Sequence, residues 1–397
     1  MLNQFLRGKM KKNNIHILCV LIDNGLNLEN SSVFQSQVVN QFIHLSKIGY
    51  STAILCFYRE VNKFKPIKQK LEKNNIKVFS IKDKNSLILN ILSACYILFS
   101  LQKKVNFFYV RGIWGALPLI LVNPIKTPKY IFDLRGDLLS EMSEISSNNV
   151  KKKIIMLIEK ISLIKSYKIS AVTSHMSNKV FLEYNRKSIT IPCCLNLNDY
   201  NTDKSIIAQK KKELGINEND IVFVYSGGLS HYQKVDQMLE IWKKFINHNN
   251  IKFMLLTNQD PHSHPITIKY LEDFKDKLFH FSLSQNDVKI YLKCCDLGFL
   301  LRDNNDLNVY ASPVKFPEYL ASGLSIVSTH NLGDISNLIV KHNLGVLIDS
   351  KNINESENKI LNFLRSNNVK TNINSNKIIK EIYDWDANNS SFKTLYS

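Results

Sequence analysis

Short apolar runs alternate with amphipathic segments along most of the chain. In the first half, apolar residues gather in strand-like runs at 15–22, 51–58, 76–81, 106–110, 129–134, 168–173 and 188–195. Segments with apolar residues at helical spacing separate nearly all of these runs, for example 33–47 and 151–166. Short apolar strands that alternate with amphipathic helices indicate a parallel sheet covered by helices on both faces.

The alternation stops at a polar stretch, residues 196–203, which suits a linker between domains. It then restarts, with strands predicted at 221–226, 251–257, 277–283, 296–301, 324–329 and 345–348. The pattern therefore predicts an α/β fold of two doubly wound, Rossmann-like domains, 1–200 and 201–375, that face each other across a cleft. In open parallel sheets ligands bind beyond the carboxyl ends of the strands, so we expect the chemistry in the strand-to-helix loops.

Length and composition agree with this organisation. The chain has 397 residues, of which 44% are hydrophobic and 22% charged, as in folded proteins of two domains. Its charge is uneven: residues 1–200 hold 29 Lys and Arg against 12 Asp and Glu, whereas the remainder holds 23 against 22. A polyanionic partner would therefore face the first half.

Two basic segments of the first half suggest what such a partner is. Residues 63–70 and 151–158 mix basic and apolar side chains, as the surfaces of peripheral membrane proteins do. An anionic membrane surface is one interpretation of these segments. Solvated lysines in a chain generally rich in Lys, Ile and Asn are the other.

Several classes of protein are not expected. The start of the chain does not resemble a secretory signal, and the apolar stretch at about 86–101 is short for a bilayer crossing, which favours a buried or surface-bound helix. The seven cysteines lack metal-ligand spacing and fit reduced core residues. His262 and His264 lie in a polar loop, where exposure to solvent is expected rather than a metal. We therefore expect a cytoplasmic protein without a metal site.

The loop at 225–234 is the first candidate for chemistry. It follows a predicted strand and contains Gly227 and Gly228, whose backbone amides can approach a ligand closely. The helix that follows begins with partial positive charge, and Lys234 adds a full charge. The loop would suit a diphosphate, although a plain tight turn explains the same residues.

A second loop, 301–323, also lies between a predicted strand and a predicted helix. Ser312 and Pro313 are expected to be the cap and first position of that helix, and Gly323 suits the left-handed residue that ends it. Lys315 and Glu318 share one helical face, where the cation can hold a phosphate and the carboxylate can accept both hydroxyl hydrogens of a ribose. A surface Lys–Glu pair is the alternative.

These residues carry a resemblance to a known family. Residues 312–327 read Ser-Pro-Val-Lys-Phe-Pro-Glu-Tyr-Leu-Ala-Ser-Gly-Leu-Ser-Ile-Val and resemble the nucleotide-sugar loop of bacterial glycosyltransferases of family 4, of the capsule or O-antigen type. The two-domain layout is similar to the GT-B fold of that family. The Gly-Gly turn with Lys234 and the segments 132–138, 191–194 and 383–386 agree with it. The last segment looks like the family's final helix, which crosses back onto the first domain, so the resemblance implies such a helix at 376–397.

The resemblance implies an enzyme, a retaining hexosyltransferase without a cofactor or an essential metal. It would move a sugar from a nucleotide diphosphate sugar to a hydroxyl of a lipid-linked oligosaccharide or surface polysaccharide precursor. Cationic groups would then stabilise the departing diphosphate, a role that falls to Lys234 and Lys315, with the amides of Gly227 and Gly228 assisting. Glu318 matches the second glutamate of the family's E-x7-E motif and would hold the ribose.

The chain departs from the family pattern at two places. The first glutamate of the E-x7-E motif is replaced by Tyr310, and Asp303 and Asp306 are nearby but out of register. The arginine that many members place just before the lysine is missing, because residues 229–233 contain none.

Two loops of the first half are further candidates. Asp133, Arg135 and Asp137 follow a predicted strand, where carboxylates flanking an arginine can orient an acceptor hydroxyl and stabilise the charge of the leaving group. A structural ion pair that supports the loop is the alternative. In the loop at 23–27, the amide of Gly25 would approach the phosphates of the donor.

Two other functions remain open at this point. A nucleotide-sugar epimerase on the same architecture would act without an acceptor. A non-enzymatic protein that binds an anionic polymer or nucleic acid would use the basic half, although that half lacks a recognisable nucleic-acid module. Under the leading interpretation the enzyme lies on the inner face of the cell membrane.

Overall fold

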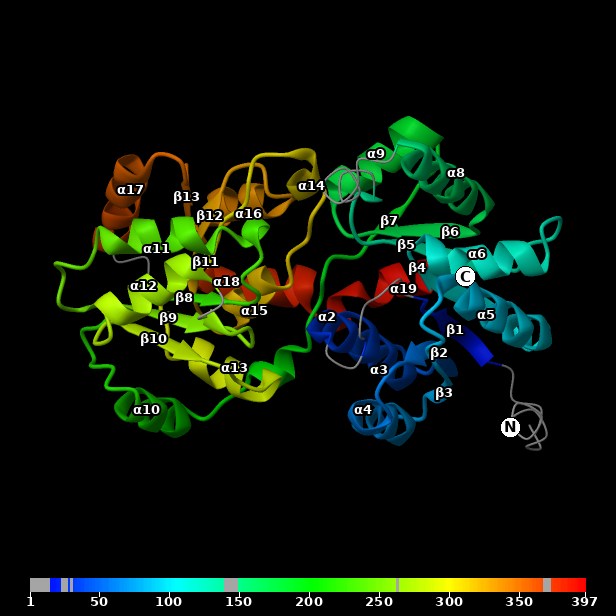
Figure 1. Ribbon diagram of the computed structural model, residues 1–397, viewed down its shortest axis with the longest axis horizontal. Helices are drawn as coiled ribbons and strands as arrows, with labels where there is room; N and C mark the ends of the chain where they lie inside the picture. Colours follow the sequence, from blue (N-terminus) through cyan, green and yellow to red (C-terminus); the bar gives the residue numbers. More distant parts are fainter. Residues whose placement is uncertain (1–14, 23–27, 29–30, 139–148, 262–263, 367–372) are drawn as a thin grey trace.

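Two parallel sheets, one in each half of the chain, form the framework of the protein (Figure 1). The computed structural model describes residues 15–22, 28, 31–138, 149–261, 264–366 and 373–397. All the apolar runs predicted to be strands form strands, and the predicted two-sheet α/β fold is confirmed.

The first sheet has seven parallel strands in the order β3-β2-β1-β4-β5-β6-β7. They are β1 Ile15–Val20, β2 Thr52–Tyr58, β3 Lys77–Lys82, β4 Val105–Arg111, β5 Tyr130–Leu134, β6 Lys168–Ala171 and β7 Ile189–Thr190. The helices of this half are α2 Ser32–Phe34, the π-helix η2 Gln35–Val39, α3 Asn40–Lys47, α4 Val61–Lys73, α5 Leu87–Leu101, α6 Ile113–Val122, α8 Asn149–Lys165 and α9 Ser174–Tyr184.

Successive side chains of the central strand β1 point alternately into two hydrophobic cores. Ile17 and Cys19 of β1 pack with the helices α3 and α4, whereas Leu18 and Val20 pack on the other face with α5, α6, α8 and α9. Because successive side chains of a strand point to opposite faces, a continuous apolar run fills both cores.

The second sheet has six parallel strands in the order β10-β9-β8-β11-β12-β13. They are β8 Ile221–Ser226, β9 Ile251–Leu256, β10 Leu278–Phe281, β11 Leu297–Leu300, β12 Ser325–Thr329 and β13 Gly345–Ile348. The helices are η3 Leu197–Tyr200, α10 Lys204–Glu213, η4 His231–Gln233, α11 Val235–Lys243, α12 Pro265–Asp273, α13 Gln285–Leu292, α14 Asp306–Val309, α15 Lys315–Ala321, α16 Ile335–His342, α17 Ile353–Arg365, α18 Ile373–Ile378, η6 Ile379–Tyr383, η7 Asp386–Asn388 and α19 Asn389–Leu395.

The last strand of the first sheet is much shorter than the run predicted at 188–195. Strand β7 covers two residues, because Pro192 has no amide hydrogen and the chain then leaves the sheet. The amide of Leu195 instead donates to the carbonyl of Tyr383 at 2.8 Å, and the carbonyl of Leu195 accepts from the amide of Trp385 at 3.2 Å. The chain thus pairs with its own C-terminal segment where it passes between the halves.

The C-terminal segment contributes to both cores. Ile379 and Tyr383 pack in the core of the second half, whereas Trp385, Phe392 and Leu395 are buried in the first, beside β1 and α3. Figure 1 shows this segment, in red, extending from the second half into the first.

The predicted helix at 86–101 is the surface helix α5. No helix in the described part of the chain is long and apolar enough to span a membrane. None of the seven cysteines is in a disulfide, and six of them are buried, as expected of reduced core residues.

We expect the C-terminal helix to be essential for the stability of the first core. Replacing Phe392, which is fully buried, by Ala should lower the free energy of unfolding by about 3–5 kcal/mol through lost burial and a cavity. Equilibrium urea unfolding followed by circular dichroism measures this change. The matched control is Lys393→Ala, one exposed position further along the same helix, which should change stability by about 0.5 kcal/mol or less. Equal midpoints for the two variants would contradict the assignment.

Candidate functional site

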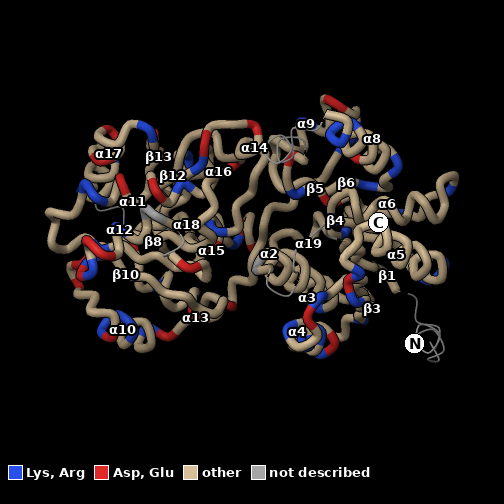
Figure 2. Tube along the Cα trace, in the orientation of Figure 1, with Lys and Arg blue, Asp and Glu red and all other residues tan. Residues whose placement is uncertain are grey.

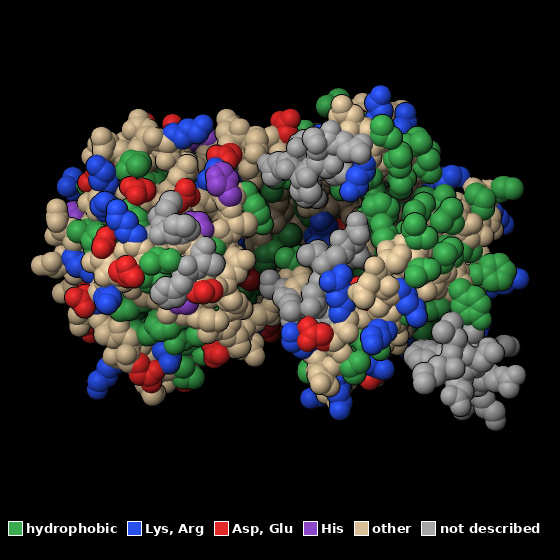
Figure 3. All heavy atoms as spheres, in the orientation of Figure 1, with side chains coloured by type: hydrophobic (Ala, Val, Ile, Leu, Met, Phe, Trp, Pro, Cys, Tyr) green, Lys and Arg blue, Asp and Glu red, His purple; other side chains and the backbone are tan. Residues whose placement is uncertain are grey.

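Two loops meet at the carboxyl ends of the central strands of the second sheet. Strand β8 ends at Ser226 and leads into the Gly227–Gly228 turn, and the neighbouring strand β11 ends at Leu300, before the loop that leads to α15. This is the edge of a parallel sheet where ligands bind. Figure 3 shows the surface hollowed between the two halves, with Lys or Arg atoms in the hollow.

Lys315 is the centre of this region. Its ammonium group donates to Oε1 of Gln233 at 2.6 Å and to the hydroxyl of Tyr225 at 3.3 Å. It also lies beside Gly227, whose φ is +146°, and a Cβ at that glycine would be 2.7 Å from the Nζ atom. The glycine therefore leaves the space through which the lysine side chain passes.

Lys234 occupies the end of the same loop in a left-handed conformation, with φ of +58°. Its side chain is buried and forms an ion pair with the carboxylate of Asp303, at 2.6 Å. Asp303 belongs to the second loop, so this pair joins the two loops that were singled out separately in the sequence.

Arg302 also belongs to this cationic region, although the sequence did not single it out. Its buried guanidinium group donates to the carbonyl of Leu301 at 2.8 Å and lies 5.4 Å from the ring of Tyr232. Within the described residues it forms no ion pair, and burial lowers its pKa. The arginine missing from residues 229–233 thus has a counterpart from the neighbouring loop. The sequence shows only an arginine directly after a predicted strand, and its burial comes from the fold.

The region holds more positive than negative charge. Burial lowers the pKa of Lys315 well below its usual range, and the nearby charge of Arg302 lowers it further. A buried cation without an opposite charge is unfavourable in an empty site, and a bound anion removes this penalty. The arrangement therefore favours an anionic ligand such as a diphosphate.

Glu318 lies one turn after Lys315 on α15. Burial raises the pKa of its carboxyl group to about 7, although the charges of Lys315 and Lys289 oppose that rise. This carboxyl group therefore changes protonation state near neutral pH.

Helix α15 begins two residues later than predicted. Its cap is Val314, without a side-chain hydrogen bond, so Ser312 and Pro313 are not its cap and first residue. Pro317 stands in the first turn, where its missing amide hydrogen has no intrahelical partner to lose, and this permits the later start. Ser312 instead accepts a hydrogen bond from the amide of Cys193, at 3.3 Å, and so links the two halves. Gly323 follows the helix with φ of +87°, as predicted.

Tyr310 contacts the first half of the protein. Its ring packs against the core of the first half, and the ammonium group of Lys179 from α9 lies 4.6 Å from the ring centroid. Lys179 also forms an ion pair with Asp137, at 2.5 Å. The residue that stands in place of the first motif glutamate thus joins the halves.

Asp133 and Arg135 form a closed network at the end of β5. One oxygen of Asp133 accepts from Nε of Arg135 and the other from the hydroxyl of Ser170, both at 2.5 Å. Burial by itself would raise the pKa of Asp133, but Arg135 and Arg111 lower it overall. Because both oxygens are occupied, the geometry favours the structural ion pair for Asp133. Arg135 keeps one buried nitrogen, Nη1, that has no hydrogen-bond partner among the described residues.

The predicted site residues therefore fall into two groups. Gly227, Gly228, Lys234, Lys315 and Glu318 surround the end of the second sheet, while Asp133 and Arg135 lie at the end of the first. No hydrogen bond or ion pair joins the two groups in the part of the chain that the structure describes. Gly25 lies outside the described residues.

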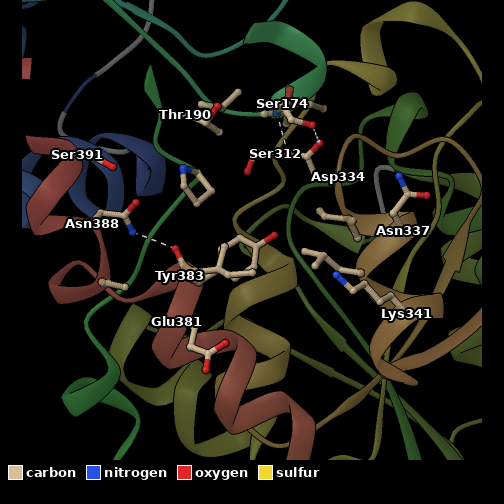
Figure 4. Close-up of a pocket in the computed structure, with 18 residues that line it drawn as sticks. Ser174, Thr190, Ser312, Asp334, Asn337, Lys341, Glu381, Tyr383, Asn388 and Ser391 are labelled. Atoms are coloured by element: carbon tan, nitrogen blue, oxygen red, sulfur yellow. Dashed lines mark hydrogen bonds between the residues drawn. The ribbon is translucent and has the colours of Figure 1, made fainter. Parts of the chain in front are cut away.

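A separate cavity of about 530 Å³ lies between the halves (Figure 4). Ser174 and Asp334 meet at its border, with the hydroxyl of Ser174 2.5 Å from the carboxylate. On the other side, Asn388 donates to the carbonyl of Ile382 at 2.9 Å. Of the predicted donor residues only Ser312 lines this cavity, so it is distinct from the cationic region.

Comparison with known proteins agrees with this geometry. Residues 206–380, which carry the cationic region, match the family model described as Glycosyl transferases group 1. No curated protein matches the sequence significantly.

Solved structures match over nearly the whole chain. A glycosyltransferase from Rickettsia africae has 15% identity and a TM-score of 0.73, and the match covers 97% of this chain and 98% of that one. HepE from Anabaena, in complex with UDP and glucose, has 13% identity and a TM-score of 0.71, with coverage of 96% and 98%. Sucrose-phosphate synthase from Thermosynechococcus elongatus has 10% identity and a TM-score of 0.68, with the same coverage. The chain thus has the GT-B fold of these proteins, and its residues 206–380 match the group 1 glycosyltransferases.

Proposed function

We propose that the protein is a glycosyltransferase that moves a hexose, with retention, from a nucleotide diphosphate sugar to a hydroxyl of a lipid-linked oligosaccharide or surface polysaccharide precursor. The observation that carries the proposal is the cluster of Lys234, Arg302 and Lys315 at the end of the second sheet. Asp303 forms the one ion pair that these cations make among the described residues. The solved neighbour HepE is described in complexes with UDP and with UDP-glucose, so a uridine nucleotide is the first donor to test.

The chemistry asked of these residues is charge stabilisation. During transfer, the bond between the anomeric carbon and the diphosphate breaks, the acceptor oxygen bonds to that carbon, and the acceptor proton is released. Negative charge develops on the departing diphosphate in the transition state. Prepositioned cations therefore stabilise the transition state more than the ground state. We propose that Lys315 and Arg302 do so together with Lys234 and the amides of Gly227 and Gly228, without a metal.

The remaining predicted residues have supporting roles in this proposal. Glu318, in its ionised form, accepts the ribose hydroxyls. Arg135 offers the unpartnered Nη1 atom to the acceptor side, positioned by Asp133. The retained configuration, the lipid-linked acceptor and a place on the cytoplasmic face of the membrane rest on the resemblance to family 4 and on the basic first half.

The first experiment tests donor binding and transfer with the full chain. We expect one of UDP, GDP, dTDP, CDP and CMP to raise the unfolding temperature selectively, because a ligand at about 100 times its Kd adds about 2.7 kcal/mol of stability. The matching sugar nucleotide should then transfer labelled sugar to a polyprenyl-diphosphate saccharide, with retention seen by NMR. Sugar epimerisation without an acceptor, or salt-sensitive binding of DNA with no nucleotide response, would contradict the proposal.

Replacing Lys315 or Arg302 by a neutral residue should lower the affinity for the nucleotide without lowering the stability of the fold. Lys315→Met and Arg302→Met should each weaken binding of the nucleotide diphosphate by about 10- to 100-fold, as loss of a charged hydrogen bond worth about 1.5–3 kcal/mol implies. Because desolvation disfavours the charge of both side chains and neither has an ion pair among the described residues, the ligand-free variants should unfold at the same or a higher temperature. Calorimetric titration and thermal unfolding measure the two effects. The control is Lys351→Met, an exposed lysine in the same half, which should change neither.

Glu318 should make nucleotide affinity depend on pH. Its pKa of about 7 in the empty site means that the carboxyl group is mostly protonated at pH 6 and mostly ionised at pH 8. If the ionised form holds the ribose, affinity should fall as pH decreases below about 7, by up to about tenfold per pH unit. Calorimetric titration across this range, with Glu318→Gln as comparison, tests it. An equally steep decrease in the Gln variant would show that another group is responsible.

A further inference from the structure

Exposed apolar side chains are concentrated on one part of the first half. Of the twenty large hydrophobic side chains that are exposed in the described chain, fifteen lie between residues 88 and 182. Figure 3 shows hydrophobic side chains gathered on the surface over α5, α6 and α8. Soluble monomers rarely expose contiguous apolar patches of this kind unless the patch binds something.

Helix α8 places its apolar residues outward. Its exposed side carries Val150, Ile154, Leu157 and Ile164, which are spaced by four, three and seven residues and so share one stripe. Its buried side carries Ile155 and Leu163 in the core together with the polar residues Glu159 and Ser162. A helix that packed only against its own core would carry mainly polar residues on its outward side. The outward stripe therefore indicates an apolar environment on that side.

Helix α5 extends the same surface. Its fifteen residues include no charged side chain. One side packs in the core through Ile91, Ala94 and Leu98, whereas Ile88, Leu92 and Phe99 are 70%, 56% and 67% exposed. Helix α6 contacts both α5 and α8, so the exposed sides of the two helices belong to one surface. We call it the α5–α8 face, defined by Ile88, Leu92, Phe99, Ile154, Leu157 and Ile164.

The α5–α8 face has a positively charged border. Residues 84–187 contain sixteen Lys and Arg but six Asp and Glu. Asp133 and Asp137 are paired with Arg135 and Lys179 inside the fold, and Glu159 is buried. Exposed lysines follow or lie on the two helices and the loop after α6, at 103, 104, 126, 153 and 160 (Figure 2).

Charge decides between the possible occupants. A second copy of the chain, docked through the same face, would bring lysines against lysines. An anionic bilayer presents an apolar interior below a negatively charged surface, and so complements both parts of the face.

We propose that the α5–α8 face docks on an anionic lipid bilayer, with α5 and α8 lying in the interfacial plane. At fifteen residues, α5 is about 22 Å long, which suits a helix lying on a bilayer rather than one crossing about 30 Å of hydrocarbon. A docked enzyme would lie close to a lipid-linked acceptor, and this part of the proposal rests on the proposed function. Docking itself does not require sugar transfer.

The two basic segments 63–70 and 151–158, which look alike in the sequence, differ in the structure. Helix α4, which contains the basic residues 63–70, buries its apolar residues Phe64, Ile67 and Leu71 in the core. Its one exposed large hydrophobic side chain is Val61, at the start of the helix, so it offers mainly charge. Of the two basic segments, only 151–158 contributes apolar side chains to the proposed docking surface.

The test measures binding of the full chain to sedimented vesicles. We expect binding to vesicles of phosphatidylcholine mixed with phosphatidylglycerol and much weaker binding to phosphatidylcholine alone. The triple variant Leu92→Ser, Phe99→Ser, Leu157→Ser should weaken binding by roughly a hundredfold. Lys153→Glu with Lys160→Glu should weaken it and reduce its dependence on salt. The matched control, Val61→Ser with Val340→Ser, removes apolar side chains that are 57% and 69% exposed elsewhere and should bind as the wild type does.

Two further measurements, the thermal shift with the nucleotide and the oligomeric state, distinguish the possible outcomes. The thermal shift with the nucleotide should be the same in every variant, which shows that the fold and the donor site are intact and separates failure of docking from failure of the proposed function. Equal vesicle binding by the triple variant and the control would overturn the proposal. So would an absence of binding by the wild type, or a wild-type dimer that the triple variant dissociates without any effect on vesicles.

Discussion

Two poorly solvated cations without an ion-pair partner among the described residues, the half-buried Lys315 and the buried Arg302, impose the main electrostatic constraint on the site in the second half. Neutral groups hold them in place: the amide oxygen of Gln233, the hydroxyl of Tyr225 and the carbonyl of Leu301. These contacts orient the cations without neutralising them. The empty site thus retains the cost of buried charge, which a bound diphosphate would offset.

The position of this site depends on how the halves are joined. Tyr310 extends from the second half under Lys179 of the first, and Asp334 accepts from the backbone and hydroxyl of Ser174 at the start of α9. The C-terminal segment adds a covalent connection, with Tyr383 in one core and Phe392 in the other. The replacement of the motif glutamate by a tyrosine is consistent with this geometry, because an aromatic ring suits the apolar contact and the cation that it meets there.

Two segments of the first half have similar sequences but present different surfaces in the folded chain. Residues 63–70 and 151–158 both mix lysines with apolar residues. In α4 the apolar residues fall on the face that packs on the sheet, whereas in α8 the outward stripe is apolar and Glu159 faces inward. Composition alone does not distinguish the two, because the difference lies in which side of each helix meets the sheet.

The sequence by itself determined the strands, their division between two parallel sheets, the glycine turn before Lys234 and the shared helical face of Lys315 and Glu318. These features follow from local periodicity and from the conformational freedom of glycine, which neighbouring residues specify. Only the tertiary structure decided that Arg302 joins the cationic region, that Asp133 is fully occupied by Arg135 and Ser170, that Ser312 bonds to Cys193 instead of capping α15, and that β7 is short. Each of these depends on contacts between segments far apart in the chain, or on burial, which changes the charge state and available partners of a side chain without changing its place in the sequence.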